Sequence, residues 1–138
     1  MGGAESSAEL IIENEFMRLY VHRDNGIIHT EIRRELEGKP FRDVLTRGAE
    51  ILEGGTANKW LSDNRGHSRL SEADEDWAKT VWFPRARAAG WKHWAIVKPA
   101  SAIGALNIAR LAKNYASLGV NTRFFSNLDE ALTWLREC

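Results

Sequence analysis

Cysteine and long apolar runs are both scarce in this chain of 138 residues. Its single cysteine, Cys138, is the last residue, so an internal disulfide and a zinc site built from several cysteines are both excluded. No apolar run approaches the roughly 18–20 residues needed to cross a bilayer. The start, MGGAESSAEL, is acidic and rich in small residues, unlike a signal peptide. We therefore expect a cytoplasmic protein without a transmembrane segment.

Net charge is also absent, because 19 Lys and Arg residues balance 19 Asp and Glu residues. Proteins that bind nucleic acid independently of its sequence need a basic surface, so the neutral charge argues against this class and we expect no nucleic-acid partner. Apolar residues make up 43% of the chain and charged residues 28%, which is ordinary for a globular domain. We expect one folded domain whose partner is a protein or a small apolar molecule, with homodimerisation through an edge strand or a helix face as an additional possibility.

Familiar catalytic and cofactor motifs are missing as well. Residues 54–56 lack the spacing and the lysine of a phosphate-binding loop, and no G-x-G-x-x-G occurs. Residues 66–70 contain only half of a nucleophile elbow. His22 and His29 could supply half of a metal site, but no cysteine or third histidine is near them in sequence. We predict no cofactor, no metal and no catalytic residue, and a non-enzyme is favoured over an enzyme.

Two short segments near the start of the chain predict a β-hairpin. Residues 15–22 and 27–33 alternate apolar and polar side chains, which is typical of strands. The Asn-Gly pair between them favours a two-residue type I′ turn. That turn would place His22 opposite His29, with one face of the hairpin buried and the other, histidine-bearing face in solvent.

Later segments alternate between helix and strand patterns. Helices are expected from Pro40 to a C-cap at Gly54 and Gly55, over residues 72–88 with a break at Pro84, over 102–118 and after Asn127; strands are expected at 58–63, 93–97 and 121–125. This order predicts an α/β fold: a mixed, mostly parallel sheet of four to five strands with an N-terminal β-hairpin and about four helices. Residues 1–13 are expected to be a flexible N-terminus and residues 14–138 the single domain.

The polar segment that follows the third expected strand is the best candidate for a binding site. Ligands of parallel sheets gather beyond the carboxyl ends of the strands. Asp63 and Arg65 can form an ion pair there, and Ser71 can cap the next helix or accept a phosphate. With nearby indoles and a further arginine, the candidate binding residues are Asp63, Arg65, Ser71, Trp77, Trp82 and Arg85. The competing interpretation is a solvated loop, a capped helix and tryptophans in the core.

Three stretches carry a resemblance to a known family: residues 59–65 (KWLSDNR), residues 82–92 (WFPRA followed by AGWK) and residues 124–135. Together they resemble the small stand-alone bacterial proteins of the STAS/SpoIIAA-like type, also labelled STAS/SEC14-domain proteins. The resemblance implies a SpoIIAA-like β-α superhelix. In anti-sigma-factor antagonists of that superfamily, a serine that starts the helix after the third strand is phosphorylated, and Ser71 falls near this place. The SEC14 label implies an apolar lipid pocket.

Three functions follow from these observations. The first is a non-enzymatic regulatory or protein-binding module that uses the strand-end surface. The alternative is a carrier of a small apolar ligand or lipid, which requires a cavity lined by aromatic and aliphatic side chains. The third is an uncharacterised enzyme in which Asp63 or His67 performs acid–base chemistry.

Overall fold

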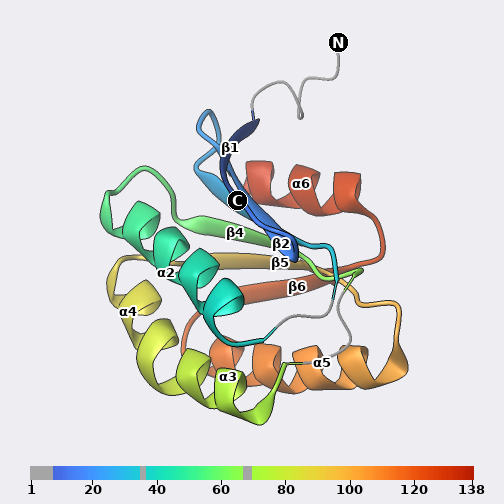
Figure 1. Cartoon of the computed structure of the whole chain (residues 1–138). Coiled ribbons are helices and arrows are strands. Elements are labelled where there is room, and N and C mark those ends of the chain that lie inside the picture. The colour runs from blue at the N-terminus through green and yellow to red at the C-terminus, as the bar shows by residue number, and fades with distance from the viewer. Residues whose placement is uncertain (1–7, 35–36, 67–69) are drawn as a thin grey trace.

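The computed structural model describes residues 8–34, 37–66 and 70–138 (Figure 1). Its strands are β1 (Ala8–Glu13), β2 (Met17–His22), β3 (Ile27–Ile32), β4 (Lys59–Asp63), β5 (His93–Val97) and β6 (Asn121–Phe125). Its helical segments are α2 (Lys39–Glu53), α3 (Glu72–Trp77), the π-helical turn η1 (Ala78–Trp82), α4 (Phe83–Ala88), α5 (Ala102–Ser117) and α6 (Leu128–Glu137). Within this described part of the chain, no helix has the length and hydropathy that a bilayer crossing needs.

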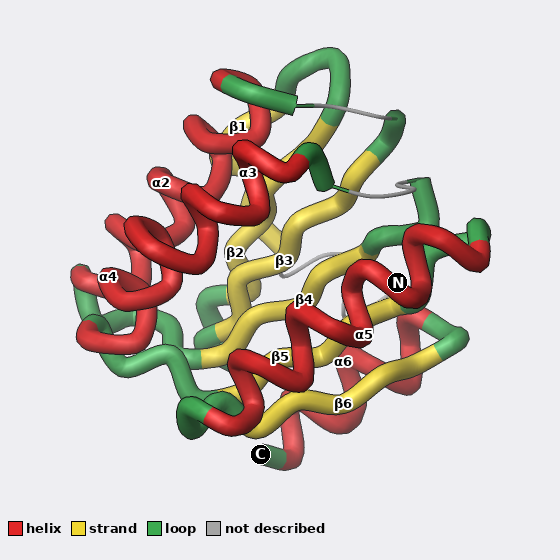
Figure 2. The backbone as a smooth tube through the Cα atoms, turned by 90° about the horizontal axis from the view of Figure 1, so that it is seen from below, coloured by secondary structure: helices red, strands yellow, loops and turns green. Residues whose placement is uncertain are grey.

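All six strands belong to one sheet in which the spatial order is the chain order, β1-β2-β3-β4-β5-β6. The β1–β2 and β2–β3 pairs are antiparallel, and the three later pairs are parallel. Each parallel connection steps in the same direction across the sheet. Because such crossovers are right-handed, α2, α3, α4 and α5 all lie on one face, and α6 lies alone on the other (Figures 1 and 2). The mixed α/β fold expected from the sequence is confirmed, with one strand more than the upper estimate.

Apolar side chains fill both sides of this sheet. The larger core lies between the sheet and the helices α2 to α5. The smaller core joins α6 to the opposite face; its buried members are Ile27, Leu61, Ala95, Val97, Ala131, Leu132 and Leu135. Since β5 lies between two covered faces, its sequence reads as a nearly continuous apolar run.

The first strand, β1, corrects the expectation that residues 1–13 form a flexible N-terminus. Residues 8–13 pair with β2 and form one edge of the sheet. Ile11 and Ile12 pack against the larger core, so burial of apolar surface holds this segment in place. Residues 1–7 lie outside the described part of the chain.

The hairpin forms as predicted, but its register differs by two residues. His22 pairs with Ile27, and Tyr20 pairs with His29. Gly26 is the only residue of the connection with a positive φ. A type I′ turn needs a positive φ at two successive residues, so a longer connection forms and Ile27 joins β3. A two-residue shift leaves each side chain on its predicted face. The face expected in solvent is nevertheless partly covered, because His22 and His29 are buried.

The break predicted at Pro84 takes the form of a change in helix type. The segment from α3 to α4 is continuous, and the five π-helical residues of η1 lie directly before the first turn of α4, where Pro84 occurs. Inside a continuous helix, a proline cannot donate to the preceding turn, and its ring crowds the carbonyl four residues earlier. The wider π-helical turn lies directly before Pro84, where this crowding must be relieved. Helical structure therefore continues through the proline instead of ending at it.

Helix α2 approaches β4 closely at Gly48, where a methyl group would overlap with the six-membered ring of Trp60. Trp60 cannot easily yield, because its Nε1 donates to Thr30 Oγ1 at 3.1 Å and its ring contacts Trp82 and Trp91. We expect Gly48→Ala to lower the free energy of unfolding by about 2 kcal/mol through overpacking, although alanine is the better helix former. Urea denaturation measures this change.

Gly54→Ala is the matched control for this substitution. Gly54 has a right-handed helical φ of −71°, and the nearest atom to an added Cβ would be 3.4 Å away. We expect its unfolding midpoint to stay close to that of the wild type. An unchanged midpoint for Gly48→Ala would show that the contact between α2 and β4 adjusts without cost.

Candidate functional site

The carboxyl end of β4 carries a fixed ion pair. Asp63 is the last residue of the strand and is 2% exposed. Its two carboxylate oxygens accept hydrogen bonds from Arg65 Nε at 2.8 Å and Nη2 at 2.7 Å. This bond raises the pKa of Arg65 above its ordinary value. The Arg65 side chain is 54% exposed, so the pair presents an oriented guanidinium to solvent. The sequence predicted this pair.

The loop that carries Arg65 is held on both sides. Asn64 donates its backbone N–H to the carbonyl of Val97 at 3.1 Å, which joins the loop to β5. On the other side, a methyl group on Gly66 would overlap with the carbonyl oxygen of Ile32 at the end of β3. Only a residue without a side chain fits at this distance. The backbone on either side of Arg65 is therefore fixed by its neighbouring strands.

Ser71 caps α3, as the sequence predicted. Its Oγ accepts the N–H of Asp74 at 3.1 Å. Asp74 is 1% exposed and accepts from the N–H of Gly38 at 2.8 Å and from Arg42 Nε at 2.9 Å. These bonds tie the start of α3 to the start of α2. Both helices lie on the face of the sheet opposite to α6, whereas Asp63 alternates in phase with Leu61 and so points to the α6 face.

The two predicted tryptophans belong mainly to the core. Trp82 is 5% exposed, and its Nε1 donates to the carbonyl of Leu45 at 2.6 Å. Trp77 is partly buried; its ring contacts the edge of Phe41, and the Arg42 guanidinium lies 5.3 Å from its centroid. Trp82 therefore cannot form part of an exposed recognition surface, and the interpretation as core tryptophans holds for it.

Arg85 lies at the opposite end of the sheet from Arg65. Its guanidinium binds both carboxylate oxygens of Glu53, at 2.7 and 2.9 Å. Glu53 ends α2, just before the chain enters β4 at its amino end. The helical segment runs back across the sheet at about 1.5 Å per residue, which separates Arg85 from Ser71 by roughly 20 Å. The expectation that Arg85 lies beside the Asp63–Arg65 loop is thus wrong.

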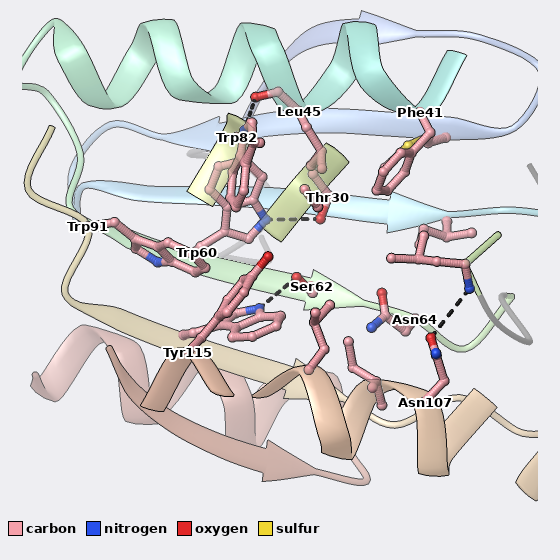
Figure 3. Close-up of a pocket in the computed structure, with 17 residues that line it drawn as sticks. Thr30, Phe41, Leu45, Trp60, Ser62, Asn64, Trp82, Trp91, Asn107 and Tyr115 are labelled. Carbon is pink, nitrogen blue, oxygen red and sulfur yellow. Dashed lines mark hydrogen bonds between the residues drawn. The ribbon is translucent and has the colours of Figure 1, made fainter. Parts of the chain in front are cut away.

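A cavity of about 70 Å³ lies between the sheet and the helical layer of α2, η1 and α5 (Figure 3). Most of its wall is aromatic or aliphatic; the lining residues are Met17, Thr30, Ile32, Phe41, Leu45, Trp60, Ser62, Asn64, Leu70, Ala78, Trp82, Trp91, Trp94, Asn107, Ile108, Leu111 and Tyr115. Our sequence reasoning missed this cavity. The available signal was polar residues at strand positions that face the larger core, namely Thr30 and Ser62.

Most of the polar groups around this cavity have partners within the protein. Thr30 Oγ1 accepts from Trp60 Nε1, and Ser62 Oγ accepts from Trp94 Nε1 at 2.8 Å. The Tyr115 hydroxyl is different, because it is buried and has no hydrogen-bond partner among the described residues. Burial raises the pKa of Tyr115, and the nearby charge of Glu75 adds to this effect. The hydroxyl therefore keeps its proton at neutral pH and can donate it.

A second polar group is buried on the other face of the sheet. His22 Nε2 and His29 Nδ1 lie 3.2 Å apart, and their rings are stacked. The remaining ring nitrogens, His22 Nδ1 and His29 Nε2, have no partner among the described residues. In the same part of the chain, no group of three or more His, Cys, Asp and Glu residues is placed to hold a metal ion.

The architecture defines an α/β protein in which a sheet with sequential strand order has the helical segments from α2 to α5 on one face and α6 on the other (Figure 2). Within this class, the chain belongs to the SpoIIAA-like family, whose family model matches residues 27–136. The match runs from the start of β3 into α6, and it confirms the resemblance seen in the sequence. Domains of this family typically bind protein partners. No curated protein matches the chain significantly.

Proposed function

We propose that this protein is a non-enzymatic regulatory module that binds a protein partner at the carboxyl end of its sheet, with Arg65 as the central contact. The observation that carries the proposal is an exposed guanidinium held by a buried carboxylate. The candidate site is narrower than the six residues considered from the sequence. It centres on Arg65 and Asp63, whereas Arg85 lies at the other end of the sheet.

The geometry of Arg65 favours recognition. Arginine is enriched among the residues that dominate protein interfaces. An arginine already fixed by two hydrogen bonds loses little conformational freedom when a partner binds. A guanidinium has five N–H donors, and Asp63 takes only Nε and one Nη2 donor. The remaining donors suit backbone carbonyls or an acidic side chain on the partner.

Catalysis and ligand carriage are less well supported. Both carboxylate oxygens of Asp63 already accept from Arg65, which leaves Asp63 poorly placed to act as a base, and His67 lies outside the described residues. Pockets for lipids and similar ligands have volumes of about 300 Å³ or more, whereas the cavity here has about 70 Å³. Phosphorylation of Ser71, homodimerisation and a cytoplasmic location stay predictions.

Arg65→Ala is expected to weaken partner binding roughly 30-fold, as for truncation of a central interface arginine. Arg85 offers a matched control. It also forms a bidentate ion pair with a carboxylate, but it lies at the opposite end of the sheet. Quantitative affinity capture from the host, with wild type, Arg65→Ala and Arg85→Ala as baits, identifies partners lost only with Arg65→Ala. Titration calorimetry on the purified partner then gives the affinities.

The two variants must keep the circular dichroism spectrum of the wild type for the comparison to be valid. If Arg65→Ala captures and binds the same partners as Arg85→Ala with equal affinity, the carboxyl-end surface is not the recognition site.

A further inference from the structure

Tyr115 is held so that its hydroxyl faces the cavity and not solvent. The side chain rises from α5, and its ring stacks on Phe83 with centroids 4.0 Å apart. Trp91 and Trp94 contact the same ring, and the residue is 2% exposed. In Figure 3 the hydroxyl oxygen points toward Trp60 and Thr30, inside the ring of lining residues. These aromatic contacts prevent the ring from turning the hydroxyl toward water.

Burial of the Tyr115 hydroxyl without a partner among the described residues destabilises the folded state. A buried polar atom without a partner loses its hydrogen bonds to water and gains none in return. Phenylalanine would make the same ring contacts at this position without that cost. Of the three buried side-chain atoms that lack partners in the described residues, only the Tyr115 oxygen faces the cavity. A molecule that supplied an acceptor in the cavity would complete this hydrogen bond.

Charge and volume define what that molecule can be. Among residues 8–34, 37–66 and 70–138, no Asp, Glu, Lys or Arg lines the cavity, so an ionised ligand would be desolvated there without a counter-charge. Apolar cavities of about 150 Å³ accept benzene, and this cavity has about 70 Å³. The ligand is therefore uncharged and smaller than a benzene ring, with an oxygen atom for Tyr115 and a short hydrocarbon body for the indole walls.

We propose that the cavity between the sheet and α5 binds a short-chain alcohol or ketone, whose oxygen accepts a hydrogen bond from the Tyr115 hydroxyl. This site lies under the helical layer and does not include Arg65, so it goes beyond the proposed protein-binding function. Its ligand class also differs from a lipid, because about 70 Å³ is small for a lipid pocket.

Titration with acetone and propan-2-ol, followed by ¹H–¹⁵N NMR of the indole N–H groups, tests the proposal. Four tryptophans line the cavity, namely Trp60, Trp82, Trp91 and Trp94, whereas Trp77 and Trp134 do not. We expect saturable shifts for the four lining indoles and none for the other two. Acetate has nearly the shape of acetone but carries a charge, so it should give no saturable shift.

Tyr115→Phe should weaken the binding of both probes at least tenfold without lowering the melting temperature, because it removes an unpaired hydroxyl and keeps the ring. Tyr20 lies on strand β2 and outside the cavity lining, so Tyr20→Phe should leave probe affinity unchanged, as should Arg65→Ala. The proposal is overturned if all six indoles shift linearly without saturation, if acetate binds as well as acetone, or if Tyr115→Phe binds the probes with wild-type affinity. The acetone–acetate comparison needs no variant, so it decides the matter even if Tyr115→Phe does not fold.

Discussion

Replacing Asp74 with alanine is expected to lower the free energy of unfolding by about 3 kcal/mol. The Asp74 carboxylate is almost completely buried and accepts from the Gly38 N–H and the Arg42 Nε. Removal of the carboxylate leaves a backbone donor and a guanidinium without their acceptor. Removing one member of a fully buried pair costs about 3–5 kcal/mol. We expect the lower end of this range, because the Arg42 side chain is 37% exposed and can be hydrated.

Two companion variants separate the causes of this effect. Asp74→Asn keeps an oxygen that can accept from Gly38 but loses the charge that faces Arg42, so its loss should be intermediate. Asp43→Ala removes an exposed partner of Lys39 on the same helix as Arg42, and exposed pairs of this kind contribute less than about 0.5 kcal/mol. Urea denaturation of the three variants gives the ranking. A loss for Asp74→Ala as small as that for Asp43→Ala would show that the link between α2 and α3 is not stabilising.

Acidification is expected to destabilise the protein through His29. Burial is the main cause that lowers the pKa of His29 to about 4, and the neighbouring His22 is the second. Asp63 raises this pKa, whereas Arg65 lowers it. In the unfolded chain the pKa of a histidine is about 6.5. Between these two values the unfolded chain binds the proton and the folded protein does not. The contribution of neutral His29 to stability is therefore complete above about pH 6.5 and is lost as the pH falls toward 4, by about 3 kcal/mol in total.

His29→Phe isolates this contribution, because phenylalanine fills a similar volume beside His22 but cannot bind a proton. Urea denaturation of both proteins at several pH values between 7 and 4 gives the difference in stability at each pH. Carboxylates that titrate near pH 4 affect both proteins and cancel in this difference. The wild type should lose about 3 kcal/mol relative to His29→Phe over this range. Parallel curves for the two proteins would contradict the burial of a neutral His29.

Features of the fold that depend on a few neighbouring residues could be predicted from the sequence. Ser71 and Asn127 have side chains that cap helices, and both accept backbone N–H groups as expected. The β1 strand escaped prediction because its pairing depends on an edge of β2 left free by the rest of the sheet, which no short sequence window reports. The hairpin register differed because Asn25 does not adopt a positive φ, and the local Asn-Gly signal was therefore weaker than the tertiary preference for burying Ile27.

The same difference between local and long-range determinants applies to the residues of the candidate site. Asp63 and Arg65 are two residues apart at a strand end, so their pairing follows from local geometry and could be predicted. The position of Arg85 depends on where a long helical segment ends relative to the sheet, and that requires the three-dimensional structure. The cavity is a volume that side chains from seven helices and strands fail to fill, and a sequence contains no direct record of such a volume.

Sequential strand order has a consequence for the way this chain is made. Each strand from β2 onward pairs with the strand synthesised just before it, so its partner has already emerged from the ribosome when it appears. Each new strand pair therefore closes a single connection and not the whole chain, which limits the entropic cost of each closure. Helix α6 is the last element of the chain, and it packs against β4, β5 and β6 on the face of the sheet that the other helices leave uncovered. Until that helix is translated, the apolar residues beneath it are exposed to water, and a nascent chain stalled before residue 128 would be the form most open to chaperone binding and aggregation.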